Sequence, residues 1–220
     1  MVFLHGYLSS KEAFAAQIAY FSKFYRVTAI DFLGFGGSKP LLQPFSVTDY
    51  AVWTKEVFAL LDIKNPHIVA HSFGCRVAVK MLAKDNNMAD KLLLTGPAGI
   101  IRKRGLKYHC KVKTYRLVRR FAPHFAERHF GSLEYRSLSP VMRESYKKIV
   151  NEDLREDASK IKNPTLIVVG EEDRTTPLAE AKIYLQSLPN GGLKRMRGGH
   201  FAFAEEPLLF NLITEEFLYD

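Results

Sequence analysis

Six short apolar runs alternate along this chain with longer segments whose apolar residues recur at helical spacing. The runs are nearly continuous in Val, Ile, Leu and Phe, which is typical of strands buried on both faces. They cover residues 2–4, 25–30, 67–70, 91–97, 164–170 and 193–196. The helical segments cover residues 11–24, 49–61, 76–82, 178–188 and 207–218. This alternation predicts an α/β fold, with a mostly parallel sheet of about six strands and helices on both faces.

Residues 98–160 interrupt the alternation of strand and helix. Within them, apolar side chains recur at helical spacing while Lys and Arg fill most other positions. This apolar stripe consists of Leu106, Cys110, Leu117 and Phe121, widened by Val112, Tyr115 and Val118. We therefore expect a core made of residues 1–97 and 161–220, with residues 98–160 inserted as a separate helical segment.

The positive charge of the chain is concentrated in this insertion. The whole chain carries a net charge of +9, whereas residues 101–148 contain fourteen Lys or Arg against three Glu. Three interpretations remain open: a solvated helix face, a positive surface that attracts an anionic substrate, or an amphipathic helix that rests on anionic lipid. Nucleic acid is not an expected partner, because no recognition module or aromatic stacking platform is present.

Composition narrows the class of protein further. Two cysteines, Cys75 and Cys110, are too few for a disulfide framework, so a reducing cytoplasm is the expected location. The chain contains no run of about 20 apolar residues, so the sequence predicts no membrane span. We expect neither a metal nor a cofactor, because the turn at residues 34–39 lacks phosphate-loop spacing and the histidines lack metal-ligand spacing.

Ser72 stands between a predicted strand and a predicted helix. The surrounding sequence is Ala70-His71-Ser72-Phe73-Gly74, with small residues two positions before and after the serine. A sharp turn of this kind exposes the serine hydroxyl at the end of the sheet and requires small flanking residues where strand and helix approach. The pattern indicates a nucleophile, although an ordinary strand-to-helix turn can also contain serine.

Two further loops offer the partners that a serine nucleophile needs. Asp173 follows the predicted strand at 164–170, and His200 follows the strand at 193–196 after two glycines. His5-Gly6 also follows a strand, so four chemically useful positions fall at the carboxyl edge of one sheet. A base that takes the serine proton and an acid that orients the base are the requirements of nucleophilic catalysis.

These motifs together resemble the α/β-hydrolase fold family, in particular its lidded serine esterases and C–C hydrolases. The resemblance rests on Leu4-His5-Gly6, on residues 31–38 and 70–74, and on the loops at Asp173 and His200. It implies that Ser72 is the nucleophile, Asp173 the acid and His200 the general base. It also implies that the backbone amides of Tyr7 and Phe73 form the oxyanion hole, and that residues 98–160 form a lid over the site.

The chain departs from the family pattern at two points. Ala70 replaces the usual glycine before the nucleophile, and the antiparallel strand pair that usually precedes His5-Gly6 is absent. Residues 25–30 then become an edge strand. Either the sheet is naturally minimal or Met1 is an internal start, and we expect the second.

The resemblance implies hydrolysis of a carboxylic ester or related acyl compound through an acyl-enzyme on Ser72. The substrate would be a small acyl molecule, and the basic lid would favour an anionic one. Two alternatives remain: a C–C hydrolase or aminopeptidase of the same fold, and a non-catalytic, hydrolase-like binding protein. His5 is interpreted as a residue that packs beneath the oxyanion loop, and His71 as one that shapes the turn at Ser72. The sequence does not indicate an oligomeric state.

Overall fold

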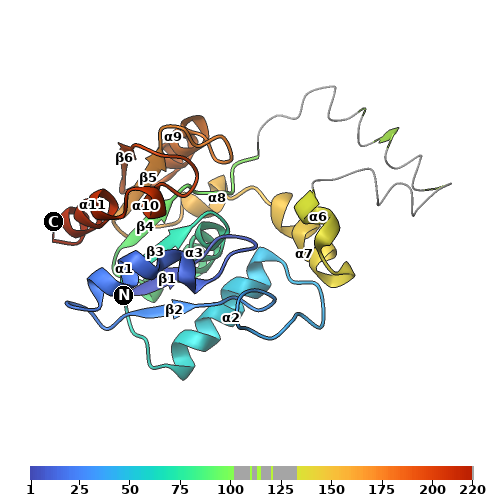
Figure 1. Ribbon diagram of the computed structural model, residues 1–220, viewed down its shortest axis with the longest axis horizontal. Helices are drawn as coiled ribbons and strands as arrows, with labels where there is room; N and C mark the ends of the chain where they lie inside the picture. Colours follow the sequence, from blue (N-terminus) through green and yellow to red (C-terminus); the bar gives the residue numbers. More distant parts are fainter. Residues whose placement is uncertain (102–109, 111–112, 115–119, 121–132, 220) are drawn as a thin grey trace.

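A computed structural model describes residues 1–101, 110, 113–114, 120 and 133–219. Within these residues, six strands form one sheet in the order β2-β1-β3-β4-β5-β6, and every neighbouring pair is parallel. The strands are β1 (Val2–Leu4), β2 (Thr28–Ile30), β3 (Ile68–His71), β4 (Leu92–Thr95), β5 (Thr165–Gly170) and β6 (Gly191–Met196). The predicted six-stranded α/β fold is confirmed (Figure 1).

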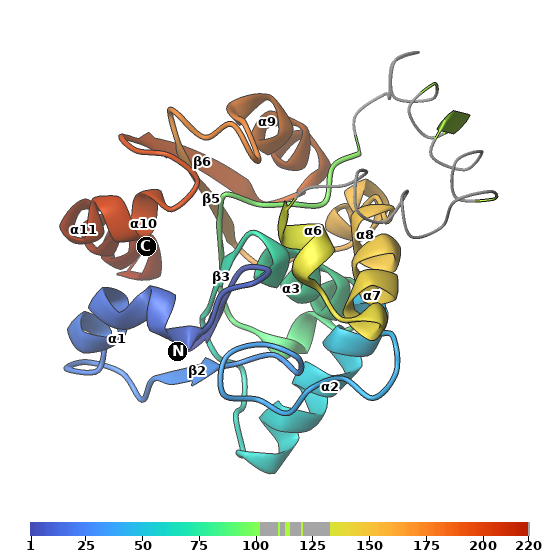
Figure 2. The same ribbon diagram turned by 45° about the vertical axis from the view of Figure 1, so that its right-hand side comes forward.

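Helices cover the two faces of the sheet in separate layers (Figure 2). The first layer contains α2 (Val47–Leu60), α3 (Phe73–Lys84), α8 (Arg155–Ala158) and α9 (Leu178–Ser187). The second contains η1 (Lys11–Phe14), α1 (Ala15–Phe21), α10 (Ala202–Glu205) and α11 (Pro207–Tyr219). A short turn of helix, η2 (Asn86–Met88), leads from α3 towards β4.

The strands contribute to both cores because successive side chains of a strand point to opposite faces. In β1, Val2 and Leu4 join the core beneath α2 and α3, whereas Phe3 packs with Phe14 and Phe21 on the other face. The inner strands β1, β3, β4 and β5 are therefore buried on both sides, which explains why their sequences are nearly continuous in apolar residues, whereas the edge strands β2 and β6 are partly exposed.

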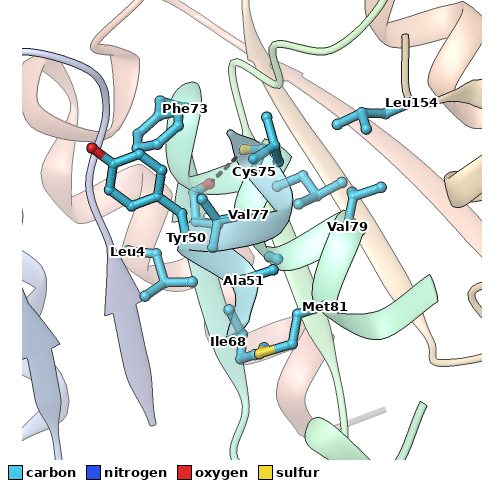
Figure 3. Close-up of a cluster of buried hydrophobic side chains, with 14 of the residues drawn as sticks. Leu4, Tyr50, Ala51, Ile68, Phe73, Cys75, Val77, Val79, Met81 and Leu154 are labelled. Atoms are coloured by element: carbon cyan, nitrogen blue, oxygen red, sulfur yellow. Dashed lines mark hydrogen bonds between the residues drawn. The ribbon is translucent and has the colours of Figure 1, made fainter. Parts of the chain in front are cut away.

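Helix α3, which follows Ser72 directly, lies at the centre of the larger core (Figure 3). Its side chains Cys75, Val77 and Val79 are buried in one cluster with Leu4 of β1 and Tyr50 of α2. Burial raises the pKa of the Cys75 thiol well above its ordinary value. Cys75 is thus a protonated packing residue, and the base of the Ser72 turn is rigidly supported.

Two helices differ in detail from the sequence prediction, one at its start and one by being divided. Helix α2 begins before the predicted residue 49 because Ser46 caps it: the Ser46 hydroxyl accepts from the Asp49 amide and the Asp49 carboxylate accepts from the Ser46 amide. The helix predicted over residues 11–24 is instead divided into η1 and α1. At its start, the Lys11 amide donates to the Asp31 carboxylate, which anchors the tighter first turn.

The described part of residues 98–160 contains α6 (Leu133–Ser137), α7 (Pro140–Val150) and α8. Helix α8 packs on α3 and α9. Helix α7 lies against the first layer, because its Met142 and Ile149 are buried in the larger core, and α6 precedes it along the chain (Figure 2). The apolar stripe predicted between residues 106 and 121 lies outside the described residues, except for the exposed Cys110. The division into a core and a lid remains a prediction.

Candidate functional site

Ser72 occupies a sharp turn between β3 and α3. Its backbone has φ 49° and ψ −103°, a region that residues other than glycine rarely adopt. The turn is stabilised on both sides, because the Ser72 amide donates to the Thr95 carbonyl and the Ser72 carbonyl accepts from the Cys75 amide. Strained backbone of this kind is concentrated at functional sites, and here it places one serine at the end of the sheet.

Gly74 explains why the turn requires a small residue after the serine. A Cβ atom at this position would lie 2.3 Å from the Leu4 carbonyl oxygen and 2.8 Å from that of His5. Both neighbours are backbone atoms of β1 and the loop that follows it, so they cannot rotate away. The close approach of α3 to β1 therefore depends on glycine.

Gly74→Ala is expected to lower the free energy of unfolding by at least about 1–3 kcal/mol, the usual cost of overpacking a rigid site. Gly192→Ala is the matched control, because its Cβ would meet only the end of the Leu166 side chain, at 3.4 Å. Urea denaturation of both variants measures the difference. Equal stability of Gly74→Ala and the parent protein would show that α3 can move away from β1.

Asp173 and His200 form a hydrogen-bonded pair across two loops. The His200 Nδ1 atom lies 2.8 Å from Asp173 Oδ2, and Asp173 is fully buried whereas the His200 side chain is 15% exposed. The other carboxylate oxygen, Oδ1, accepts from the amides of Thr175 and Thr176 at 2.8 and 2.9 Å. Burial alone would raise the pKa of Asp173, but hydrogen bonds from His200 and Thr176 hold that pKa below its ordinary value.

The two loops are packed tightly against each other. A Cβ atom at Gly170 would lie 2.2 Å from the Gly199 carbonyl oxygen, so the chain before Asp173 touches the chain before His200. Gly198 has φ 103°, which only glycine adopts readily, and the Gly199 amide donates to Glu205 at 2.7 Å. The glycine pair thus allows a turn that brings His200 back over Asp173.

Ser72 and His200 line one cavity of about 390 Å³ at the carboxyl edge of the sheet. Tyr7, Tyr135, Leu138, Tyr146 and Phe201 contribute most of its apolar wall. Asp173 lies behind His200, on the Nδ1 side of the ring. The structure therefore brings the three predicted catalytic residues to one place, from three loops that follow β3, β5 and β6.

The two residues predicted to form the oxyanion hole both lie close to Ser72. Tyr7 is in the loop after β1 and lines the cavity, whereas Phe73 is the first residue of α3 and its side chain is buried. Their rings are 5.7 Å apart and perpendicular. These contacts support the backbone of both residues, although the use of their amides remains a prediction.

Helix α7 forms part of the cavity wall and is held at both ends. The Tyr7 hydroxyl donates to the Met142 carbonyl at 3.3 Å, near the start of α7. At the other end, Arg76 of α3 is buried and donates to the carbonyls of Ile149 and Glu152, both at 2.9 Å. A cation on the last carbonyls of a helix is favourable, so α7 is fastened to the helix that follows Ser72.

Asp31 and His5 make local hydrogen bonds in the loops around the cavity. The Asp31 carboxylate accepts from the Lys11 amide, the Lys11 ammonium and the Gly37 amide at 2.7, 2.8 and 3.0 Å. His5 is buried, with Nδ1 2.7 Å from the Gly6 carbonyl and Nε2 accepting from the Phe32 amide. Both side chains brace the loops around the cavity.

Several residues of the site could not be recognised from the sequence. Thr176 bonds Asp173 through both its amide and its hydroxyl, and a threonine three residues after an aspartate is a weak turn signal. Tyr135 and Tyr146 reach the cavity only through the placement of α6 and α7. His71, interpreted as a residue that shapes the turn, also contacts the loop of His200.

His71 makes stability depend on pH. Burial, assisted by the nearby His200, lowers the pKa of His71 to about 3. The unfolded chain binds this proton near pH 6.5, whereas the folded protein binds it only near pH 3. Between these values the unfolded state holds more protons, so the free energy of unfolding falls as the pH falls.

His71→Phe is expected to remove this dependence. Between pH 7 and pH 5 the parent protein should lose about 2 kcal/mol more stability than the variant. Urea denaturation at the two pH values measures both losses. Equal losses would contradict a neutral, buried His71.

Comparison with known proteins assigns the family. A sequence profile of the alpha/beta hydrolase family matches residues 1–211, and this chain belongs to that family. The AB hydrolase superfamily protein YisY of Bacillus subtilis is 24% identical over 242 residues, which cover 99% of this chain and 90% of that protein. The probable lysophospholipase BODYGUARD 3 of Arabidopsis thaliana is 32% identical over 103 residues, but these cover only 44% of this chain and 21% of that longer protein.

Solved structures share the fold over nearly the whole chain. An esterase from Exiguobacterium antarcticum has a TM-score of 0.79 at 21% identity, covering 100% of this chain and 91% of the esterase. The enol-lactonase from Burkholderia xenovorans has a TM-score of 0.77 at 20% identity, covering 100% of this chain and 90% of the lactonase. The resemblance inferred from the motifs is confirmed, and membership of this family supports a hydrolase.

Membrane-spanning helices and clusters of metal-ligand side chains are both absent from the described residues. No described helix is both long and apolar enough to cross a membrane. The described residues also contain no group of three or more His, Cys, Asp or Glu side chains that could hold a metal ion.

Proposed function

We propose that this protein hydrolyses a carboxylic ester, or a related acyl compound, through an acyl-enzyme on Ser72. The observation that carries the proposal is the His200–Asp173 pair of 2.8 Å beside a cavity that Ser72 shares with His200. A strained serine, an imidazole and a buried carboxylate in this arrangement are the parts that nucleophilic acyl transfer needs.

In the first half of the reaction, His200 would take the proton of Ser72 while the serine oxygen attacks the acyl carbon. Asp173 accepts the hydrogen bond from Nδ1, which leaves Nε2 without a proton and able to act as the base. The developing oxyanion would be bound by the amides of Tyr7 and Phe73. One such donor contributes about 2.7–4 kcal/mol to the transition state.

The first half would end when His200 gives the proton to the leaving alcohol, whose bond to the acyl carbon breaks to leave the acyl-enzyme. In the second half, water entering the same cavity would lose a proton to His200 and attack the acyl carbon. His200 would then give that proton to the Ser72 oxygen as its bond to the acyl carbon breaks, which releases the acid and restores Ser72. All the proton transfers of both halves therefore use one imidazole.

The cavity wall favours an uncharged acyl group. Tyr7, Leu138 and Phe201 are apolar or aromatic, and no Lys, Arg, Asp or Glu lines the cavity among the described residues. This part of the site gives no support to an anionic acyl group. An anionic leaving group would instead have to meet the basic insertion at residues 98–160, which includes α6 and α7 and which we propose acts as the lid.

Hydrolysis of p-nitrophenyl esters with acetyl, butyryl, octanoyl and benzoyl groups tests the proposal. We expect the purified protein to release p-nitrophenol from at least one short or aromatic ester, with multiple turnovers. A folded protein that turns over none of these esters would contradict ester hydrolysis. Turnover of a C–C diketone or of an amino-acid amide in their place would support the alternative hydrolases of the same fold.

A further inference from the structure

His71 lies immediately before Ser72, at the end of β3, and its side chain is buried. Its Nε2 atom is 3.0 Å from the backbone carbonyl oxygen of His200. Its ring also packs on the rings of His200 and Phe203, with centroids 4.7 and 4.8 Å apart. One side chain of the Ser72 turn therefore contacts both the backbone and the ring of the proposed base.

The opposite edge of the same ring faces the loop that carries Tyr7. A Cβ atom on Gly6 would lie 2.8 Å from His71 Nδ1 and 3.2 Å from Cε1. The imidazole thus fills the space that a side chain at position 6 would occupy. His71 therefore contacts two further loops of the site besides its own turn: the His5-Gly6 loop and the loop of His200.

The contact with His200 determines the tautomer of His71. A carbonyl oxygen only accepts hydrogen bonds, so the Nε2 atom of His71 must carry the proton and donate. The Nδ1 atom is then an acceptor, and it is buried without a hydrogen-bond partner. Because burial lowers the pKa of His71 to about 3, the ring stays neutral wherever the enzyme would work.

We propose that His71 is a positioning residue, which sets the spacing between the loop of the base and the loop of the oxyanion hole. The inference rests on the proposed function of Ser72 and His200. The loop of His200 needs such support because two glycines precede the histidine. Glu205 accepts from the Gly199 amide and His71 bonds the His200 carbonyl, so the turn is held both within the flexible pair and directly after it.

The variants His71→Phe and His71→Gln test separately the packing of the ring and the hydrogen bond that its Nε2 atom donates. Phenylalanine keeps a ring but has no N–H group, whereas the glutamine amide can donate from nearly the position of Nε2. We expect His71→Phe to lower kcat about two- to tenfold with little change in KM, and His71→Gln to recover part of that loss. His67→Phe is the matched control, because His67 precedes β3 and pairs with Asp90 away from the cavity.

Titration of active sites with a fluorophosphonate distinguishes positioning from general loosening of the fold. A positioning role lowers the rate per reactive site, whereas a loosened fold lowers the number of reactive sites and leaves the rate of each unchanged. Equal kcat for the parent and His71→Phe would overturn the proposal. A loss in His71→Phe as large as that in Ser72→Ala would also overturn it, by making His71 a proton-transfer group.

Proton NMR of the resting protein tests the inference without any substrate. The His200 N–H that bonds Asp173 should give a downfield resonance, and its exchange with water reports how firmly the loop is held. We expect faster exchange in His71→Phe than in the parent or His67→Phe, with partial restoration in His71→Gln. Unchanged exchange in His71→Phe would overturn the positioning role. If the parent protein hydrolyses no ester but this pattern is found, the proposed reaction fails while the positioning role stands.

Discussion

Ser72→Ala is expected to abolish ester hydrolysis and leave the fold intact. The variant has no oxygen to form the acyl-enzyme, and in serine hydrolases the loss of the nucleophile lowers kcat on the order of 10⁶-fold. Alanine keeps a Cβ atom and therefore the same backbone preferences, so the positive φ at this position costs no more than it does with serine. The neighbouring contacts of the turn are backbone hydrogen bonds and do not involve the hydroxyl.

Steady-state hydrolysis and thermal unfolding, measured on the same preparations, test this expectation. Ser187→Ala is a suitable control, since its hydroxyl bonds only the Ile183 carbonyl within α9. We expect Ser187→Ala to retain activity and Ser72→Ala to unfold at nearly the parent temperature. Retained turnover in Ser72→Ala would assign the nucleophile to another residue.

Asp173→Asn is expected to reduce kcat about 10⁴-fold with little change in fold. The carboxylate oxygen Oδ1 accepts from the amides of Thr175 and Thr176, so the single oxygen of asparagine should remain at that position. The new NH₂ group would then stand where Oδ2 faced His200 Nδ1. A donor there stabilises the tautomer with the proton on Nε2, which cannot take a proton from Ser72.

Glu172→Gln provides the control, because it makes the same chemical change at the exposed neighbouring residue. Measured kcat values should differ by several orders of magnitude between the two variants. Near-normal turnover in Asp173→Asn would mean that the acid assignment is wrong, whatever the result for Ser72→Ala.

The sequence predicted the sheet well because its four inner strands are buried on both faces. In β4 and β5, Leu92–Thr95 and Thr165–Gly170 have apolar residues towards both cores, and such runs are recognisable without any long-range information. Helix α2 was also recognisable from local information, because its apolar residues recur at helical spacing. The single helix expected over residues 11–24 is wrong in detail because Asp31, far along the chain, binds its first residue.

The candidate site was predictable only where residues follow strands directly. Ser72, Asp173 and His200 could be placed at one edge of the sheet from their positions after β3, β5 and β6. Tyr146 could not, because it reaches Tyr7 through the packing of α7, and their ring centroids are 5.3 Å apart. The bond between His71 and the His200 carbonyl joins residues 129 positions apart, and neither residue carries a local signal for it.

Labelling with a fluorophosphonate probe, followed by mass spectrometry of the intact protein and its peptides, tests the central proposal most directly. An activated Ser72 should take up one probe molecule, on the peptide that contains Ala70-His71-Ser72-Phe73-Gly74. Labelling should disappear in Ser72→Ala and slow markedly in His200→Ala, with both variants folded. A folded parent protein that takes up no probe, or takes it up on another residue, would contradict the assignment of Ser72 as the nucleophile.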